Sequence, residues 1–328
     1  MINSILKSKE MSIAGIVLLL CIILTIMSPA FLSPGNLLDI LKGNAVLGIL
    51  AVGMTLIIIT GGIDVSVAAV TSAVWVIIGK LLVLMPDSPV AILLLFIIAP
   101  LIGVFFGAIN GFLVSRIQIP AIVVTLGTMS MINGIVLYIT NGQYLNSTSF
   151  PSIFLKFANF NIFGVSILTI LFIVIAVFTW FVLKYTVIGR EVLAIGGNKE
   201  SAIRVGINFD KVQIFVFSYM GFLAGIAAIA QLSYTKAVDP NGMLGFELTV
   251  IAAVVLGGAN IMGGRGSIVG TFLGVLLLAI MENGLILARI DTFWQQVVIG
   301  IVILLAVSFD HIQYKRAKNK MARIEVEA

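Results

Sequence analysis

The segment VAILLLFIIAPLIGVFFGAINGFLV, residues 90–114, contains no charged side chain and decides the class of fold. A helix rises about 1.5 Å per residue, so a helix of this length extends about 37 Å and crosses the roughly 30 Å hydrocarbon layer of a bilayer. Similar apolar runs recur along the 328 residues, of which 60% are hydrophobic and 10% charged. Soluble domains carry about 25% charged residues. The composition excludes an ordinary soluble domain and predicts an all-α polytopic membrane protein.

Apolar length and the positions of helix breakers predict about ten transmembrane helices in a single domain over residues 1–328. The expected spans are 13–30, 45–60, 65–85, 90–114, 119–139, 162–183, 212–232, 248–261, 268–288 and 293–309. Lys7 and Lys9 precede the first span, but no small-residue cleavage pattern follows it. We therefore expect a retained span and not a signal peptide.

The distribution of basic residues predicts the orientation, because Lys and Arg in short loops are retained on the cytoplasmic side. With the N-terminus inside, the outer side receives only five of the 19 Lys and Arg, namely Lys42, Lys80, Lys156, Lys236 and Arg289. The bias predicts cytoplasmic N- and C-termini and a cytoplasmic loop at 184–211.

The two halves of the chain resemble each other when one is displaced by 173 residues. Gly48-Ile49-Leu50-Ala51 then aligns with Gly221-Phe222-Leu223-Ala224, Asn110-Gly111 with Asn283-Gly284, and Arg116 with Arg289. The displacement corresponds to five spans, an odd number, so the second copy enters the membrane from the opposite side. We expect a 5+5 inverted repeat with halves at about 12–140 and 162–310.

Polar side chains within or beside the spans are candidates for a translocation path, because ionisable and amide groups in a membrane usually face a cavity or a partner. The candidates are Asp64, Ser66, Asn110, Thr125, Asn133 and Glu247. Asp64 and Glu247 each precede an Ala-Ala-Val run, and capping of a helix N-terminus is the alternative role for both. Hydrogen bonding between helices is the alternative for the amides and hydroxyls.

The span at 90–114 has one helix face without side chains, because glycines recur there at i, i+4 and i+8. These glycines are Gly103, Gly107 and Gly111. Gly221 and Gly225 have the same i, i+4 spacing in the span at 212–232. Small residues at this spacing allow helices to approach closely in a membrane. We expect both stripes to be packing surfaces.

The sequence contains no motif that predicts an enzyme. The Gly-rich run at 257–267 lacks the Lys-Ser/Thr pair of a phosphate-binding loop, since Gly258 and Gly263 are followed by Gly264. The single cysteine, Cys21, lies in the first span, and the chain has no His/Cys/carboxylate cluster for a metal. We expect no cofactor and no metal, and any use of ATP would require a partner.

The loop at 184–211 contains Glu200-Ser201-Ala202-Ile203-Arg204-Val205-Gly206, which resembles the Glu-Ala-Ala, three residues, Gly signature of ABC importer permeases. The resemblance implies a short coupling helix that contacts an ATP-binding subunit. The ATPase-coupling residues that it implies are Gly189, Arg190, Lys199, Glu200, Ser201, Ala202, Arg204 and Gly206. We expect Ala202 and Gly206 to face water in the isolated subunit.

Further motifs, spread from about residue 24 to 310, resemble the permease subunits of monosaccharide ABC importers, the ribose, xylose, arabinose and galactose group. These motifs are Gly61-Gly62-Ile63-Asp64-Val65-Ser66-Val67, Ile119-Pro120-Ala121 with Thr125-Leu126-Gly127-Thr128, Gly189-Arg190, Ala194-Ile195-Gly196-Gly197-Asn198, Ile251-Ala252-Ala253-Val254-Val255-Leu256-Gly257-Gly258 and Gly263-Gly264-Arg265-Gly266. Ala68 departs from the glycine that many relatives carry after the Asp-x-Ser-Val run. That departure leaves the sub-branch open.

The resemblance implies a multi-pass permease in a bacterial cytoplasmic membrane. Its implied partners are a second permease copy or paralogue, a cytoplasmic ATP-binding subunit and an extracytoplasmic sugar-binding protein, with no nucleic acid. Permeases of the same group for autoinducer-2, rhamnose or nucleosides are alternatives. A secondary transporter driven by an ion gradient is another, because inverted repeats and intramembrane acids suit it equally.

Overall fold

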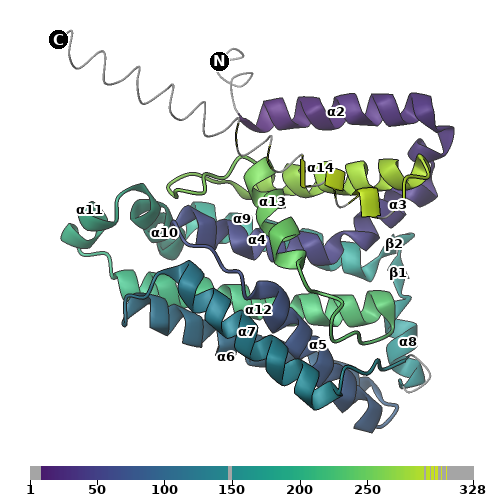
Figure 1. Cartoon of the computed structure of the whole chain (residues 1–328), viewed down its shortest axis with the longest axis horizontal. Helices are drawn as coiled ribbons and strands as arrows, with labels where there is room; N and C mark the ends of the chain where they lie inside the picture. The colour runs from purple at the N-terminus through teal and green to yellow at the C-terminus, as the bar shows by residue number, and fades with distance from the viewer. Residues whose placement is uncertain are drawn as a thin grey trace.

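The computed structural model describes residues 9–146 and 150–291 and a few positions between 293 and 308. Its long helices lie side by side in one bundle, with α10 and α11 at one end and α8 and a small β-hairpin at the other (Figure 1). The helices are α2 (Lys9–Met27), α3 (Pro34–Gly43), α4 (Ala45–Ile59), α5 (Val67–Leu84), α6 (Pro89–Ser115), α7 (Ala121–Thr140), α8 (Ser152–Ala158), α9 (Ile167–Tyr185), α10 (Val187–Gly197), α11 (Lys199–Arg204), α12 (Phe209–Thr235), α13 (Phe246–Leu256) and α14 (Ile268–Leu287). A 3₁₀ turn, η1, covers Pro29–Leu32, and the antiparallel hairpin pairs β1 (Asn161–Ile162) with β2 (Val165–Ser166).

The structure confirms the prediction of an all-α polytopic membrane protein. Among the described residues, seven helices are long and apolar enough to cross a bilayer, and α3 with α4 forms an eighth candidate that bends by 48°. The bend falls at Asn44, between the two helices. The expected span at 293–309 lies largely outside the described residues, and the inverted repeat stays a prediction.

The expected span at 248–261 is wrong as a continuous crossing helix. α13 has 11 residues, so it rises only about 16 Å. Its end is set by Gly257 and Gly258, because Gly258 adopts a φ of 90°, a left-handed conformation that a side chain disfavours. Residues 257–267 form a loop that leads to α14.

The expected span at 162–183 begins too early. Phe163 and Gly164 form the turn of the hairpin with φ values of 50° and 83°, and α9 starts only at Ile167. The Ser166 hydroxyl caps this helix by accepting a hydrogen bond from the Leu168 amide. Apolar composition alone did not distinguish the hairpin from the first turn of a helix.

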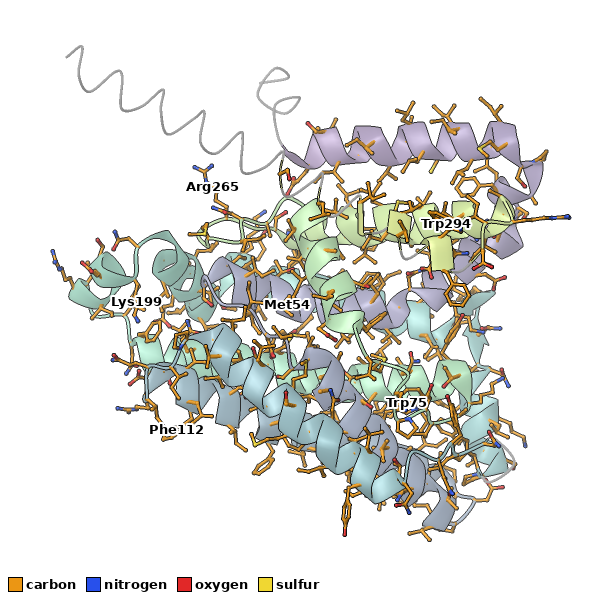
Figure 2. The ribbon with its side chains drawn as sticks, in the orientation of Figure 1. Met54, Trp75, Phe112, Lys199, Arg265 and Trp294 are labelled. Atoms are coloured by element: carbon orange, nitrogen blue, oxygen red, sulfur yellow. The ribbon has the colours of Figure 1, made fainter. Side chains whose placement is uncertain are left out.

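The centre of the bundle is α4, in which every residue from Ala45 to Ile59 is buried. α2 lies at the edge against α14, while α6 and α7 lie on the opposite side (Figure 1). Trp75 of α5 joins the core to the loop after α12, because its indole Nε1 donates a hydrogen bond of 3.0 Å to the Ala237 carbonyl (Figure 2).

The most extensive helix contact among the described elements is that of α6 with α12, which confirms the packing role of both glycine stripes. A methyl group on Gly103 would overlap the carbonyl oxygen of Gly221, and one on Gly221 would overlap that of Gly103. Gly107 lies in the same way against Phe217, and Gly225 against Ala99. Without Cβ atoms the two backbones touch, so this pair forms a rigid unit.

Candidate functional site

Three of the six candidate path residues, Asp64, Ser66 and Asn110, form one connected polar network inside the bundle. Asp64 Oδ1 accepts hydrogen bonds from the Ser66 amide at 2.8 Å and the Ser66 hydroxyl at 2.6 Å. Asn110 of α6 donates from Nδ2 to Ser66 Oγ at 2.9 Å. The turn between α4 and α5 is thereby tied to α6, the helix of the rigid α6–α12 pair.

Thr125 of α7 joins the same turn from the other side. Its hydroxyl accepts a hydrogen bond of 3.2 Å from the Val65 amide and donates one of 2.9 Å to the Ala121 carbonyl of its own helix. The turn that carries Asp64 is therefore hydrogen-bonded to α6 on one side and to α7 on the other.

Asp64 lies just before α5, which begins at Val67 with Ser66 at its N-cap position. The Asp64 carboxylate accepts from the backbone amide two positions further on, as in an Asx turn or an N-cap, so a capping role is compatible with the structure. Asp64 is 3% exposed and forms no ion pair within the described part of the chain. Asn110 Oδ1 is buried and, among the described residues, has no hydrogen-bond partner. Burying polar groups without partners is costly. Such groups are typical of a site that contacts a polar solute or water.

The two other path candidates, Asn133 and Glu247, line a separate small pocket between α5, α7 and α13. Its volume is about 10 Å³, which is room for about one water molecule. Ser72, which the sequence analysis missed, also lines it and donates a hydrogen bond of 3.2 Å to the Pro240 carbonyl. The only sequence signal for Ser72 is its position on α5, one helical turn beyond Ala68 and therefore on the same face of the helix.

Glu247 is 9% exposed and lies in the first turn of α13. The N-cap residue, Gly245, has a φ of 81° and no side chain to cap the helix. In this position the carboxylate interacts favourably with the dipole of α13, and it also lines the pocket.

The predicted coupling loop at 184–211 is mostly helical. The Thr186 hydroxyl accepts a hydrogen bond from the Gly189 amide at the start of α10, and Asn198 Oδ1 accepts one from the Ser201 amide at the start of α11. Gly206 ends the turn after α11 with a φ of 92°. Lys199 Nζ lies 3.7 Å from the centre of the Phe209 ring, at the outer end of the bundle (Figure 2).

The coupling candidates divide into exposed and buried residues. Those with exposed side chains or backbone are Arg190, Lys199, Glu200, Ser201, Arg204 and Gly206. The expectation that Ala202 faces water is wrong, because Ala202 is 4% exposed and belongs to the hydrophobic core. Gly189 is also buried, since a side chain there would overlap the carbonyl oxygens at the end of α9.

The structure adds two apolar residues that the sequence analysis did not select. Ile203 of α11 is 48% exposed and Val205 is 77% exposed, next to the pair of Glu200 and Arg204, whose charged atoms lie 4.0 Å apart. Exposed apolar side chains beside charges, at the end of a bundle, are typical of a protein contact surface.

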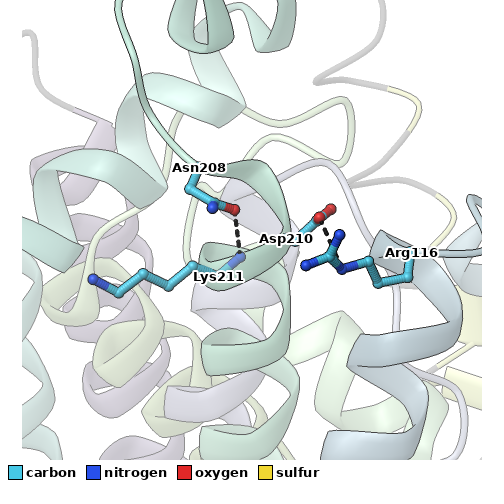
Figure 3. A network of polar contacts seen from close by, with 4 residues as sticks. All are labelled: Arg116, Asn208, Asp210 and Lys211. Atoms are coloured by element: carbon cyan, nitrogen blue, oxygen red, sulfur yellow. Dashed lines mark hydrogen bonds and ion pairs between the residues drawn. The ribbon is translucent and has the colours of Figure 1, made fainter.

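An ion pair fixes α6 to α12 at the same end. Arg116 Nε lies 3.1 Å from Asp210 Oδ2, and the side chain of Asn208 caps α12 by accepting a hydrogen bond of 3.0 Å from the Lys211 amide (Figure 3). The ion pair adds one more contact, at the end beside α11, to the glycine contacts along the two helices.

These features define a multi-pass membrane protein with buried polar groups and a helical loop that projects from one end. The chain belongs to the family described as the permease component of the branched-chain amino acid transport system, whose model matches residues 36–307. Membership in this family makes it a transport subunit.

Relatives resemble the chain over most of its length. It is 34% identical to the ribose import permease protein of Haemophilus influenzae, over 92% of this chain and 93% of that protein. It is 37% identical to the ribose import permease protein of Bacillus subtilis, over 89% of each. It is 33% identical to the autoinducer 2 import system permease protein of Escherichia coli, over 94% of this chain and 89% of that protein. No solved structure matches the chain.

Proposed function

We propose that this chain is the transmembrane subunit of an ATP-driven importer that carries a monosaccharide, such as ribose or a related pentose or hexose, across a bacterial cytoplasmic membrane. The names of the relatives at 34% and 37% identity support a sugar as the solute. The autoinducer 2 permease, at 33% identity, supports the alternative solute.

The observation that carries the ATP-driven part is the exposed surface of α11. Ile203 and Val205 present apolar side chains at one end of the bundle, held in place by the buried Ala202. An ATP-binding subunit docked there would cover them, and hydrolysis in that subunit would supply the energy. The chain itself carries no phosphate-binding loop motif.

The polar network around Asp64 and the pocket at Glu247 supply groups that can exchange hydrogen bonds with a hydroxyl-rich solute. Both adjoin α5, since Ser66 is its N-cap residue and Ser72 lies within it. The solute would pass between this subunit and a second copy or paralogue, after delivery by an extracytoplasmic binding protein. Selectivity can then reside in that binding protein.

In the proposed orientation, α10, α11 and both termini lie in the cytoplasm. A membrane-impermeant thiol reagent tests it on variants of a Cys21→Ser background. Ser201→Cys on α11 should react only after the cells are opened, whereas Phe163→Cys, at the fully exposed tip of the hairpin, should react in intact cells. The reverse pattern would contradict the orientation.

A secondary transporter is the second candidate, because Asp64 is buried and forms no ion pair in the described ranges. A carboxylate in that state can bind a proton or a metal cation during transport.

Reconstitution in liposomes separates the candidates. The chain is combined with its genomically adjacent ATP-binding and binding-protein partners, and uptake of labelled ribose is measured with ATP, without ATP and with an ionophore. ATP-dependent uptake that the ionophore leaves unchanged is expected. Uptake by the chain alone under an ion gradient would favour the secondary transporter, and ATP-dependent uptake of autoinducer-2 but not ribose would refute the sugar assignment.

A further inference from the structure

Three segments far apart in the sequence meet, backbone against backbone, beside α11. They are the end of α4 with the turn after it, the last turn of α10, and the loop after α13. The Gly264 amide of the loop donates a hydrogen bond of 2.9 Å to the Ile59 carbonyl at the end of α4. Gly196 of α10 lies against both of these groups. We name this contact, formed by Ile59, Gly61, Gly196, Gly263 and Gly264, the glycine junction.

The junction has no room for side chains. A methyl group on Gly196 would overlap the Ile59 carbonyl oxygen and lie 2.9 Å from the Gly264 nitrogen. One on Gly264 would lie 2.9 Å from the Gly196 oxygen, and one on Gly263 would lie 3.1 Å from the Gly61 Cα. Gly61, Gly263 and Gly264 also have φ values of 81°, 88° and 79°, which glycine adopts without strain.

Each segment of the junction leads directly to one of the features described above. α11 begins at Lys199, three residues after Gly196. The turn that begins at Gly61 contains Asp64. The loop with Gly264 continues from α13, whose first turn holds Glu247. The junction therefore lies between the proposed docking helix and both groups of path residues.

The helices at the two ends of the loop, α13 and α14, also pack backbone against backbone. A methyl group on Gly257, at the end of α13, would lie 2.5 Å from the Gly270 carbonyl oxygen, and one on Gly274 would overlap that of Ala253. Flexible side chains can absorb a small displacement by changing rotamer, whereas backbone groups in direct contact pass it on.

We propose that the glycine junction transmits the movement of α10 and α11 to the turn that carries Asp64 and to α13, with α6 and α12 as the fixed frame. The proposal rests on the proposed function, since it assumes that an ATP-binding subunit moves α11. The junction thus makes Gly196 and Gly264 positioning residues for transport, although neither contacts the solute.

Adjacent glycines of α10 provide a matched pair of variants. Gly196→Ala places a methyl group in the junction, whereas Gly197→Ala meets no heavy atom within 4 Å in the described structure. In the reconstituted complex, Gly196→Ala should lower ATP-dependent uptake about tenfold or more, which is the effect of about 1.4 kcal/mol on a barrier. Stimulation of ATP hydrolysis by loaded binding protein should fall with it, while the amount of copurifying ATP-binding subunit stays the same. Gly197→Ala should resemble the native chain in all three measurements. Equal uptake by the two variants would overturn the proposal.

A second measurement leaves every glycine in place, in case Gly196→Ala does not fold. Spin labels are attached at Leu193 of α10, at Met262 of the loop and at Phe112 of α6, which are 37%, 79% and 50% exposed. The distance between the labels at Leu193 and Met262 should be the same in the nucleotide-free and the ATP-bound complex. The distance from each of these labels to the label at Phe112 should change. A change in the distance between the labels at Leu193 and Met262 would overturn the proposal. Unchanged distances from these labels to Phe112 would also overturn it. Failure of the proposed function is recognised separately, because the native chain would then show no ATP-dependent uptake.

Discussion

Asn36 of α3 and Asn283 of α14 form a reciprocal pair of amide hydrogen bonds. Asn36 Nδ2 donates to Asn283 Oδ1 at 3.0 Å, and Asn283 Nδ2 donates to Asn36 Oδ1 at 2.8 Å. The pair holds the bent segment before α4 against α14, at the end of the bundle opposite α11 (Figure 1). A partly buried amide that loses its partner keeps the cost of its desolvation.

Removing one member of this pair should destabilise the bundle. Asn36→Ala or Asn283→Ala alone is expected to cost about 1–3 kcal/mol, because the remaining amide is left unsatisfied. The double variant should be less destabilised than the sum of the two singles. Thermal unfolding in detergent measures both effects, with Asn241→Ala, at an exposed loop position, as control. Additive losses would show that the two amides act independently.

Asp64→Asn should impair transport more than stability. Asparagine keeps an oxygen that accepts the hydrogen bond from the Ser66 amide, but it removes the charge from the network. Uptake by the reconstituted complex should fall about tenfold, while the unfolding temperature stays close to that of the native chain. Asp291→Asn, at an exposed position, serves as the control for loss of a carboxylate. Native uptake by Asp64→Asn would leave Asp64 with a structural role only.

Val205→Asp should weaken the contact with the ATP-binding subunit without disturbing the fold. Val205 is 77% exposed, so the isolated subunit should change by less than about 0.5 kcal/mol. Copurification of the ATP-binding subunit should drop, whereas Phe163→Asp, in the hairpin at the other end, should leave it intact.

Ala202→Trp, on α11 just before Val205, provides the contrasting outcome. Because Ala202 is buried, the larger side chain should destabilise the isolated subunit by about 1–3 kcal/mol, and this loss should appear before any partner is added. Unchanged thermal unfolding of Ala202→Trp would contradict the buried position.

The loop between α5 and α6 should make stability depend on pH. Asp87 accepts hydrogen bonds from the Ser152 hydroxyl at 2.6 Å and the Ile153 amide at 2.9 Å, and these bonds hold the pKa of Asp87 below its usual value. A lowered pKa in the folded state adds stability above the unfolded pKa of about 3.9, and this stability is lost as the pH falls through the folded pKa. Asp87→Asn should therefore lower the unfolding temperature at pH 7, and the difference should shrink below about pH 4. A constant difference across this range would refute the role of the charge.

Some of the candidate site followed from the sequence because the chemistry of single residues is local. A carboxylate or amide beside an apolar span has few inexpensive environments, so Asp64, Asn110 and Glu247 were identifiable without coordinates. Which of these residues lie together in space could not be identified from the sequence. Asp64, Ser66 and Asn110 form one network and Thr125 bonds the backbone of the same turn, whereas Asn133 and Glu247 share another pocket with Ser72.

The sequence by itself determined that this is a helical membrane protein, because long apolar runs cannot be accommodated in any other way. It also determined the packing faces of α6 and α12, since a stripe of glycines is a property of one helix. Only the tertiary structure decided that Ala202 is buried and that Gly196 touches Ile59 and Gly264. These outcomes depend on which distant backbones meet, and a contact between segments far apart in the chain leaves no periodic signal in either segment.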